Sequence, residues 1–394
     1  MFGSIYIGLS GLDAYAKGLQ AISNNVSNLN SNGFKSSTVS FSDLAGIEGN
    51  GGGQYASGKG AGGYGVTMGD PLLDLAQGDL QQTDRDLDLA IDGSGFLMLM
   101  KGDQIAYTRT GSFEVDKDGF IVLSGTDYRL ATLDDKGKPV SLSIDASRTS
   151  APSATTKVTF ADNISSTMTK PYTVNNITVY DQNGGQHVWT ATFTKDPSAP
   201  NQISVSVVDA TGKTIGDPQT LKFSPAGVID PTTTSLTFTD SDASLSVAFD
   251  FSNVSSFSGA DASTLSTTAT DGHGAGTIST VTVNDSGQIE IAYSNQQKKD
   301  LGSVAIADFR NPDGLKQQNG GLFTDPGTAQ RSLYASGDPR VGKVQSRRLE
   351  ASNVDLSQAF SELILIQRGF QASSQIISVT NDMIQQLFGI RGQG

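Results

Sequence analysis

Both ends of the chain have helical periodicity with almost no charge, and this feature most constrains the fold. Residues 1–29 contain only two charged side chains, Asp13 and Lys17. Residues 354–388 contain four: Asp355, Glu362, Arg368 and Asp382. A long amphipathic helix with so few charges needs packing partners. The sequence therefore predicts two terminal helices that bury their apolar faces against each other or against neighbouring chains.

In the first helix, apolar residues recur every three or four positions and so share one face. They are Leu9, Leu12, Ala16, Leu19, Ile22, Val26 and Leu29. Glycines at positions 8, 11 and 18 each weaken a helix by about 1 kcal/mol relative to alanine. We expect this helix to depend on its partners for stability, with Leu9, Leu12, Leu19, Ile22 and Val26 in the contact.

The C-terminal helix has two apolar arcs. Asp355 and Gln358 form a plausible capping box at its start, and Gly389 is its predicted end. The first arc is Leu363, Ile366, Phe370, Ile377, Ile384 and Phe388. The second arc is Leu365, Ile376, Val379, Met383 and Leu387. Two arcs predict helical neighbours on two sides, and the alternative is one partner helix within the chain.

A polar strip lies between these arcs. It consists of Arg368, Gln371, Gln375, Ser378, Asp382 and Gln386. Most of these side chains are uncharged, and the strip therefore differs from an ordinary solvated helix face.

The interior of the chain is patterned for strands. Residues 84–92 alternate aspartate with apolar residues and predict a solvated edge strand. Strands are also expected at 96–100, 105–108, 113–115 and 120–123, and in a Ser/Thr-rich stretch at 177–180, 188–193, 203–208, 236–238 and 245–251. The Gly-rich tract 46–65 is expected to be an extended connector and a hinge.

Together these patterns predict a multidomain α plus all-β fold with a nested layout. Residues 1–30 and 354–394 form a terminal helical core, a coiled coil. Residues 31–70 and 340–353 form an extended connector. Residues 71–144 and 285–339 form an inner β domain, and residues 145–284 form an inserted outer β domain, sandwich-like or barrel-like.

Composition excludes several classes of function. The net charge of −13 argues against nucleic acid, which requires clustered lysine and arginine. The absence of cysteine removes disulfides, thiolate nucleophiles and cysteine metal sites. No apolar run approaches the roughly 18 residues of a membrane span, so no membrane insertion is expected. The N-terminus also lacks the pattern of a cleaved signal peptide.

No motif indicates catalysis. Residues 58–63 match GxGxxG, but no expected strand precedes them, and they are interpreted as linker. Asp84, Asp86 and Asp88 resemble the start of a calcium loop, but Leu89 and Gly95 occupy the positions that need glycine and glutamate. We therefore predict no catalytic residues, no cofactor and no metal, and a protein that is not an enzyme.

Two segments near the ends resemble a known family. Residues 24–35 (NNVSNLNSNGFK), 349–356 (LEASNVDL) and 367–372 (QRGFQA) resemble signatures of the bacterial flagellar axial proteins, the rod, hook and hook-associated subunits. The matching positions are Asn24, Asn25, Asn28, Gly33, Phe34, Lys35, Leu349, Glu350, Ser352, Asn353 and Val354. Residues 91–96, 107–113 and 311–315 resemble the family's first β domain. Gly369 departs from the pattern, since alanine is usual there.

Chain length and the single inserted β domain make the sequence most similar to the hook subunits of this family. The resemblance implies a self-assembling homopolymer, a curved hollow tube that transmits torque and encloses an export channel. It implies contacts with rod, hook cap and hook-associated junction proteins and with the flagellar type III export apparatus. It also implies an extracellular location without a cleaved signal. Gln371, Gln375, Ser378 and Gln386 are then expected to face the channel.

Three alternatives stay open. The chain could be a distal rod or hook-associated subunit of the same family. It could be a secreted β-rich adhesin with helical ends, which would be a folded monomer. A glycan-active enzyme using paired aspartates is the third.

Overall fold

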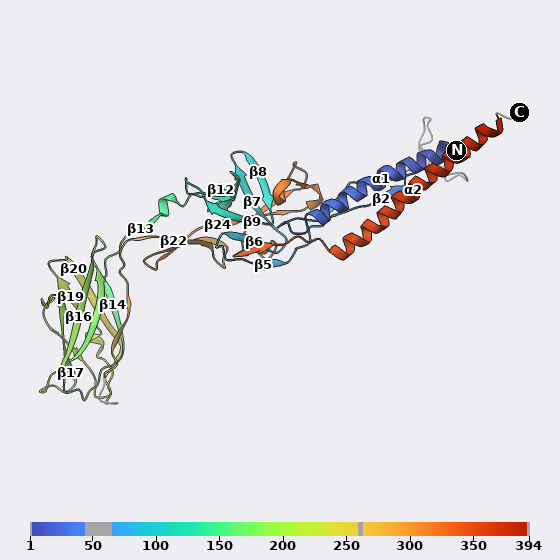
Figure 1. Ribbon diagram of the computed structural model, residues 1–394. Coiled ribbons are helices and arrows are strands. Elements are labelled where there is room, and N and C mark those ends of the chain that lie inside the picture. The colour runs from blue at the N-terminus through green and yellow to red at the C-terminus, as the bar shows by residue number, and fades with distance from the viewer. Residues whose placement is uncertain (1, 44–64, 259–262, 392–394) are drawn as a thin grey trace. The chain divides into compact units, whose positions relative to one another are not determined.

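The computed structural model describes residues 2–43, 65–258 and 263–391 (Figure 1). The chain forms two compact units. The terminal unit consists of Met1–Asp145, Val281–Glu290 and Asp300–Gly394. The middle unit consists of Ala146–Thr280 and Ile291–Lys299. The predicted four-part division is finer than these two units and stays a prediction.

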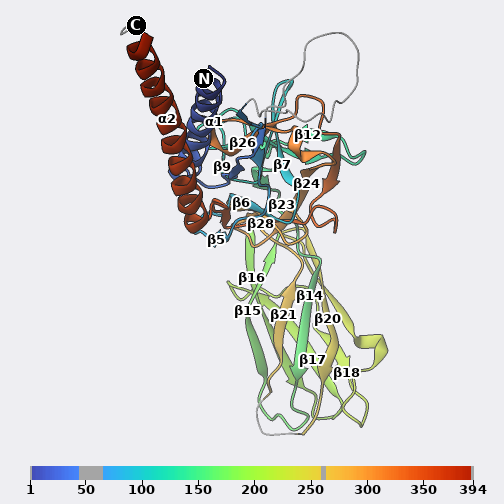
Figure 2. The ribbon, with the colours of Figure 1, turned by 90° about the vertical axis from the view of Figure 1, so that its right-hand side faces the viewer.

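Two long helices from opposite ends of the sequence lie side by side in the terminal unit. Helix α1 is Phe2–Ser27 and helix α2 is Leu356–Arg391. Gly8 faces Ile377, whereas Gly18 faces Ile366, so the helices run antiparallel. The views in Figures 1 and 2 agree, with both chain ends at the same end of the pair. Ile22, Ala359 and Ile366 form the buried centre of their contact.

The start of α2 follows the prediction in part, and its end does not. The Asp355 carboxylate accepts hydrogen bonds from the backbone amides of Ser357 (2.7 Å) and Gln358 (3.1 Å), so Asp355 is a true N-cap. The Gln358 side chain donates to Glu362 instead of completing a capping box. The helix continues through Gly389, so the predicted stop is wrong. One glycine costs a helix only about 1 kcal/mol.

Short strands return the chain along α1 before it enters the β region. Strand β1 (Ser37–Thr38) pairs with β4 (Leu72–Leu73), and β2 (Phe41–Asp43) pairs with β3 (Val66–Met68), both antiparallel. The tract 46–65 therefore joins two strands that are hydrogen-bonded to each other, although most of it lies outside the described residues. The predicted role of this tract as a connector and hinge falls on residues outside the described ranges and stays a prediction.

The β region of the terminal unit is built on two apolar clusters. Its strands before the middle unit are β5 (Leu80–Gln82), β6 (Asp88–Asp92), β7 (Phe96–Lys101), β8 (Gln104–Thr108), β9 (Thr110–Val115), β10 (Ile121–Leu123), β11 (Arg129–Leu133) and β12 (Pro139–Ser141). Those after it include β26 (Leu322–Thr324), β27 (Arg331–Ala335), β28 (Lys343–Ser346) and β29 (Arg348–Glu350). Leu89, Leu97 and Ile306 are fully buried in one cluster, and Phe96, Met98 and Phe323 are buried in the other.

Strand β6 corrects one prediction. It lies between β9 and β28, and Asp88, Leu89, Ala90 and Ile91 are all buried. The expected solvated edge strand is therefore a central strand that is covered on both faces. Period-two alternation of aspartate and leucine could not reveal this, because the pairing partner β28 comes from the far end of the sequence.

The middle unit is a sandwich of two four-stranded sheets (Figure 2). One sheet has the order β15 (Tyr172–Tyr180), β16 (Gln186–Lys195), β17 (Gln202–Asp209), β18 (Gln219–Lys222). The other has the order β19 (Ser235–Asp240), β20 (Leu245–Ser255), β14 (Lys157–Asn163), β21 (Ser266–Thr270). Alternate side chains meet in one core around Trp189, Phe160 and Phe249, as period-two strands require.

Candidate functional site

The contact between α1 and α2 is a seam of glycines, which sequence reasoning treated only as weak points. A Cβ atom at Gly8 would lie 2.7 Å from Cγ1 of Ile377, and one at Gly11 would lie 2.5 Å from Oγ of Ser373. At Gly18 the distance to Cδ1 of Ile366 would be 3.0 Å. The missing side chains therefore let the helices approach closely. Their spacing of three and seven residues places them on one face.

The predicted contact residues of α1 divide between two environments. Ile22 is fully buried, whereas Leu12, Leu19 and Val26 are half-buried at the edges of the seam. Leu9 is 53% exposed and does not belong to the seam. The centre of the contact on α1 is therefore formed by Gly8, Gly11 and Gly18, each one residue before a predicted leucine.

The first apolar arc of α2 faces α1. Ile366 is buried, and Leu363, Ile377 and Ile384 are half-buried, while Phe370 stays 37% exposed. The Phe388 side chain lies outside the described residues. Buried Ser373 and Thr380 complete this face at seven-residue intervals from Ile366.

The second arc of α2 is exposed within the part of the chain that the structure describes. Leu365 is 71% exposed, Ile376 44%, Val379 46% and Met383 52%. Phe360 and Ile364 on the same helix are also exposed. The four residues of the second arc share one side of the helix, and exposed apolar residues gathered on one helix face mark an interaction site.

The polar strip lies on the side of α2 away from the seam. Gln371, Gln375, Ser378 and Gln386 are all exposed, as are Arg368 and Asp382. At 100° per residue, these positions lie roughly opposite Ile366, Ser373 and Thr380. The strip therefore makes no contact with α1.

Charged residues far apart in the sequence meet at the base of the helix pair. We call the cluster of Lys35, Arg109 and Glu350 the junction. Lys35 Nζ lies 2.5 Å from one Glu350 carboxylate oxygen, and Arg109 Nε lies 3.2 Å from the other. None of the three side chains is more than 1% exposed.

Backbone groups complete the junction. Lys35 Nζ also donates to the Ala76 carbonyl at 2.6 Å, and the Gly78 amide donates to Glu350 at 2.9 Å. The Arg109 guanidinium donates to the carbonyls of Gly95 and Gly93. Every charge is thus hydrogen-bonded, as burial requires.

Burial dominates the electrostatics of the junction. It lowers the pKa of the Lys35 ammonium, although Glu350 acts in the opposite direction. Burial also lowers the pKa of the Arg109 guanidinium, again against the pull of Glu350. Two buried cations share one carboxylate, so the cluster carries an excess positive charge.

The remaining motif residues hold the backbone around the junction. Asn25 donates to the Ser37 carbonyl at 2.8 Å and accepts from its amide at 3.0 Å. Asn353 accepts from the Ser36 amide at 2.8 Å and donates to the Asp74 carbonyl at 2.7 Å. Gly33 has φ +69°, a left-handed conformation that favours glycine, and its amide bonds the Glu350 carbonyl.

The other motif positions act locally. Asn28 donates to the Asn24 carbonyl at 2.9 Å where α1 ends. Phe34 is buried, Leu349 pairs with Gln81 in the short β29–β5 ladder, and Val354 packs against the helix contact. Ser352 accepts from the Val354 amide at 3.3 Å. The structure therefore brings both terminal motifs together, and adds Arg109 from the 107–113 segment.

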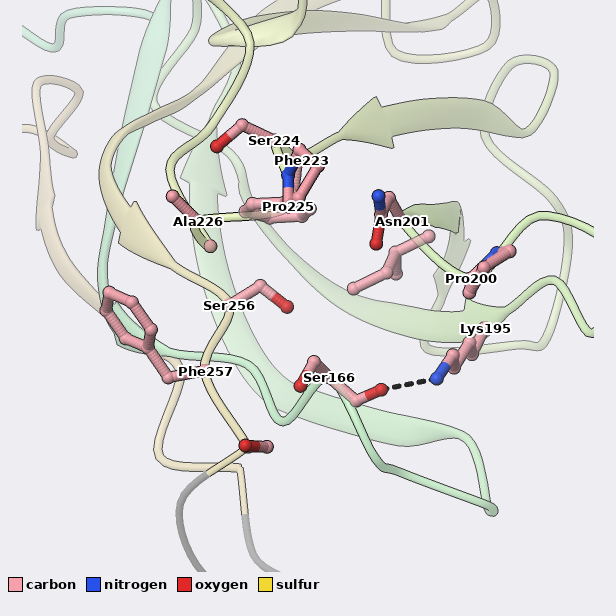
Figure 3. A pocket seen from close by; sticks show the side chains of 13 residues that line it. Ser166, Lys195, Pro200, Asn201, Phe223, Ser224, Pro225, Ala226, Ser256 and Phe257 are labelled. Carbon is pink, nitrogen blue, oxygen red and sulfur yellow. Dashed lines mark hydrogen bonds between the residues drawn. The ribbon is translucent and has the colours of Figure 1, made fainter.

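The middle unit has a pocket of about 220 Å³ at the edge of its sandwich (Figure 3). Lys195 donates to the Ser166 carbonyl beside Asn201, and Phe257 lines the opposite side. The lining has no carboxylate or imidazole that could act as a general acid or base. Across the described residues, no group of three or more histidines and carboxylates could hold a metal. Within the same residues, no helix is long and apolar enough to cross a membrane.

Comparison with known families identifies three matching regions. Residues 90–181 match the family described as flagellar hook protein FlgE/F/G D1 domain. Residues 143–302 match flagellar basal body protein FlaE D2 domain. Residues 345–390 match flagellar basal body rod FlgEFG protein C-terminal.

Similar proteins extend over nearly the whole chain. The flagellar hook protein FlgE of Salmonella typhimurium is 28% identical, with 97% of this chain and 98% of that protein covered. FlgE of Borreliella burgdorferi is 27% identical, covering 99% and 100%. The basal-body rod protein FlgG of Bacillus subtilis is 25% identical, covering 99% and 100%. A crystal structure of Helicobacter pylori FlgE2 aligns with a TM-score of 0.49 and 13% identity, covering 69% of this chain and 99% of that one.

Proposed function

The chain belongs to the bacterial flagellar hook and rod protein family, and from this premise we propose how it works as a structural subunit of the hook. The subunits assemble into a curved hollow helical tube. The tube acts as a flexible universal joint that transmits torque and encloses the export channel. The observation that carries this proposal is the uncovered apolar arc of α2, which has no partner within the described chain.

The helix pair forms the core layer of the tube, packed as a coiled coil against copies of itself. Leu365, Ile376, Val379 and Met383 meet apolar residues of neighbouring subunits, because leaving them exposed to water is unfavourable. The exposed Ile7 and Leu9 of α1 are candidate partners on the neighbouring copy. The seam between α1 and α2 stays within each subunit.

The polar strip faces the channel. Gln371, Gln375, Ser378 and Gln386 offer exposed, uncharged hydrogen-bonding groups. Along these four positions, an unfolded chain in transit would meet uncharged polar groups that bind it only weakly. A density map of the tube that placed this strip between subunits would contradict the assignment.

The two β domains form outer layers in a nested arrangement. Residues 71–144 and 285–339 form the inner β domain, and residues 145–284 form the outer one, with connectors at 31–70 and 340–353. Support comes from the sandwich of the middle unit, whose core is independent of the clusters in the terminal unit.

The partners follow from position in the flagellum. The subunit contacts rod proteins at one end of the hook and hook-associated junction proteins at the other, and the hook cap during growth. It leaves the cell through the type III export apparatus without a cleaved signal and functions extracellularly.

Electron microscopy of the purified full-length chain tests the assembly. We expect curved tubes from the parent chain and loss of tubes from the variant I376Q/V379Q, with the monomer still folded by circular dichroism. The matched control S378Q changes a neighbouring exposed position outside the apolar arc and should still form tubes.

Other outcomes would favour the alternatives. Straight tubes would favour a rod subunit, in line with the similarity to FlgG. Equal assembly of parent and I376Q/V379Q would contradict a role for the apolar arc. A parent that stays monomeric under all conditions would favour the adhesin alternative.

A further inference from the structure

Among the described residues of the helix pair, the pattern of the glycine seam reverses at Tyr15. At Gly8, Gly11 and Gly18 the gap lies on α1, and α2 supplies the side chain. At Tyr15, α1 supplies the side chain and Gly369 of α2 supplies the gap. A Cβ atom at Gly369 would lie 2.6 Å from Cζ and 2.7 Å from Cε1 of the Tyr15 ring. Those distances are too short for any real contact.

The Tyr15 ring also touches the hairpin that returns along α1. Its centroid lies 5.2 Å from that of Phe41 in β2, at an interplanar angle of 48°. Phe41 covers Gly18 in turn, since a Cβ there would lie 3.1 Å from Cζ of Phe41. The ring, which belongs to α1, therefore contacts two other segments, α2 and β2.

We infer that Tyr15 and Gly369 form a specificity-determining contact of the helix pair. Tyr15 requires glycine at position 369, and the contact holds both α2 and the β2–β3 hairpin on α1. Between Leu356 and Phe388, α2 has no other glycine, so no other position in that stretch offers the ring the same space. The inference concerns contacts within one chain and goes beyond the proposed polymer.

The substitution Gly369→Ala tests this inference because two effects predict opposite signs. Helix propensity alone favours alanine over glycine by roughly fivefold in the helix equilibrium. A clash with Tyr15 instead destabilises the pair, since overpacking outweighs that gain. The readout is amide hydrogen exchange of the full-length monomeric chain, resolved to peptides of α1, α2, β2 and β3.

We expect Gly369→Ala to make exchange in α1 and α2 about tenfold faster in the parent chain. In a Tyr15→Ala background the same substitution should slow exchange several-fold. Tyr15→Ala alone should also speed exchange in β2 and β3, and Tyr15→Phe, which keeps the ring, should not. Peptides of β16 and β17 serve as an internal standard in each sample.

Gly3→Ala is the matched control, since a Cβ at Gly3 would have no described atom within 4 Å beyond its chain neighbours and its own helix backbone. It should give the same small change in both backgrounds. Slower exchange from Gly369→Ala in both backgrounds would overturn the inference, as would unchanged β2 and β3 exchange in Tyr15→Ala. Should Gly369→Ala unfold the helix pair, the Tyr15→Ala/Gly369→Ala chain must restore it. Because the monomer is measured, failure to form tubes would leave the result intact.

Discussion

At the residue scale, the junction joins the segment that follows α1 to the segment that precedes α2. Glu350 is the single carboxylate between two buried cations, and Lys35 and Arg109 reach it from separate segments. The two terminal motifs made Lys35 and Glu350 recognisable as candidates. Their contact could not be predicted, because one sequence does not show which residues pair across 315 positions. The role of Arg109 was missed for the same reason.

Removing Glu350 should be far more damaging than removing Lys35. Glu350→Gln keeps the shape but leaves two buried cations without a counter-ion, a loss of about 3–5 kcal/mol in the free energy of unfolding. Lys35→Met leaves Arg109 and Glu350 as a balanced pair and should cost less. Chemical denaturation of both variants checks this, and equal losses would contradict the excess positive charge.

The junction should also give a pH dependence at high pH. Burial lowers the pKa of Lys35 below its ordinary value of 10.5, so the unfolded chain binds the proton more tightly than the folded chain. Stability from this residue is therefore reduced below its folded pKa and recovers as pH rises toward 10.5. The free energy of unfolding of the parent, measured relative to Lys35→Met, should increase between neutral and alkaline pH. A flat or falling difference would contradict the direction of the shift.

At the scale of elements, periodicity predicted helices and strands well where packing follows the local pattern. Ile22 and Ile366 are buried at the helix contact. Leu9 is not, because the glycines one position ahead bring α2 closer to their own side of α1. Strand β6 and the end of α2 differ from expectation for a related reason. Strand β6 is covered by partners distant in sequence, and α2 continues through Gly389 because its neighbouring residues favour the helix.

The pairing of β2 with β3, which flank the 46–65 tract, leads to a further prediction. Replacing residues 46–63 by a short Asn-Gly turn should leave the helix pair intact, because β2 and β3 already hold the ends together. The shorter loop should raise the free energy of unfolding by about 1–2 kcal/mol through its smaller closure entropy. Thermal unfolding of the full chain measures this, and a loss of helical signal would contradict the prediction and favour a tract that links separate layers.

At the scale of the whole molecule, the terminal unit is assembled from three stretches and the middle unit from two. The sequence indicated a β-rich interior between helical ends, and alternating apolar residues such as Val205 and Val207 are fully buried in the sandwich. Which strands of the terminal unit pair could not be predicted, since β24 (Lys298–Phe309) joins strands from before and after the middle unit.

The contact between Lys35 and Glu350 has a kinetic consequence. It joins residues 315 positions apart, so its contribution to contact order is close to the largest that a chain of 394 residues allows. Contacts of this kind form late, because the entropy of closing the loop is lost before any compensating interaction forms. The β-sandwich has hairpins such as β16–β17 that close over a few residues. It can therefore fold before the segments that contain Lys35 and Glu350 meet. We therefore expect the contact between Lys35 and Glu350 to form after the β-sandwich has folded, and a chain that lacks Glu350 cannot form it.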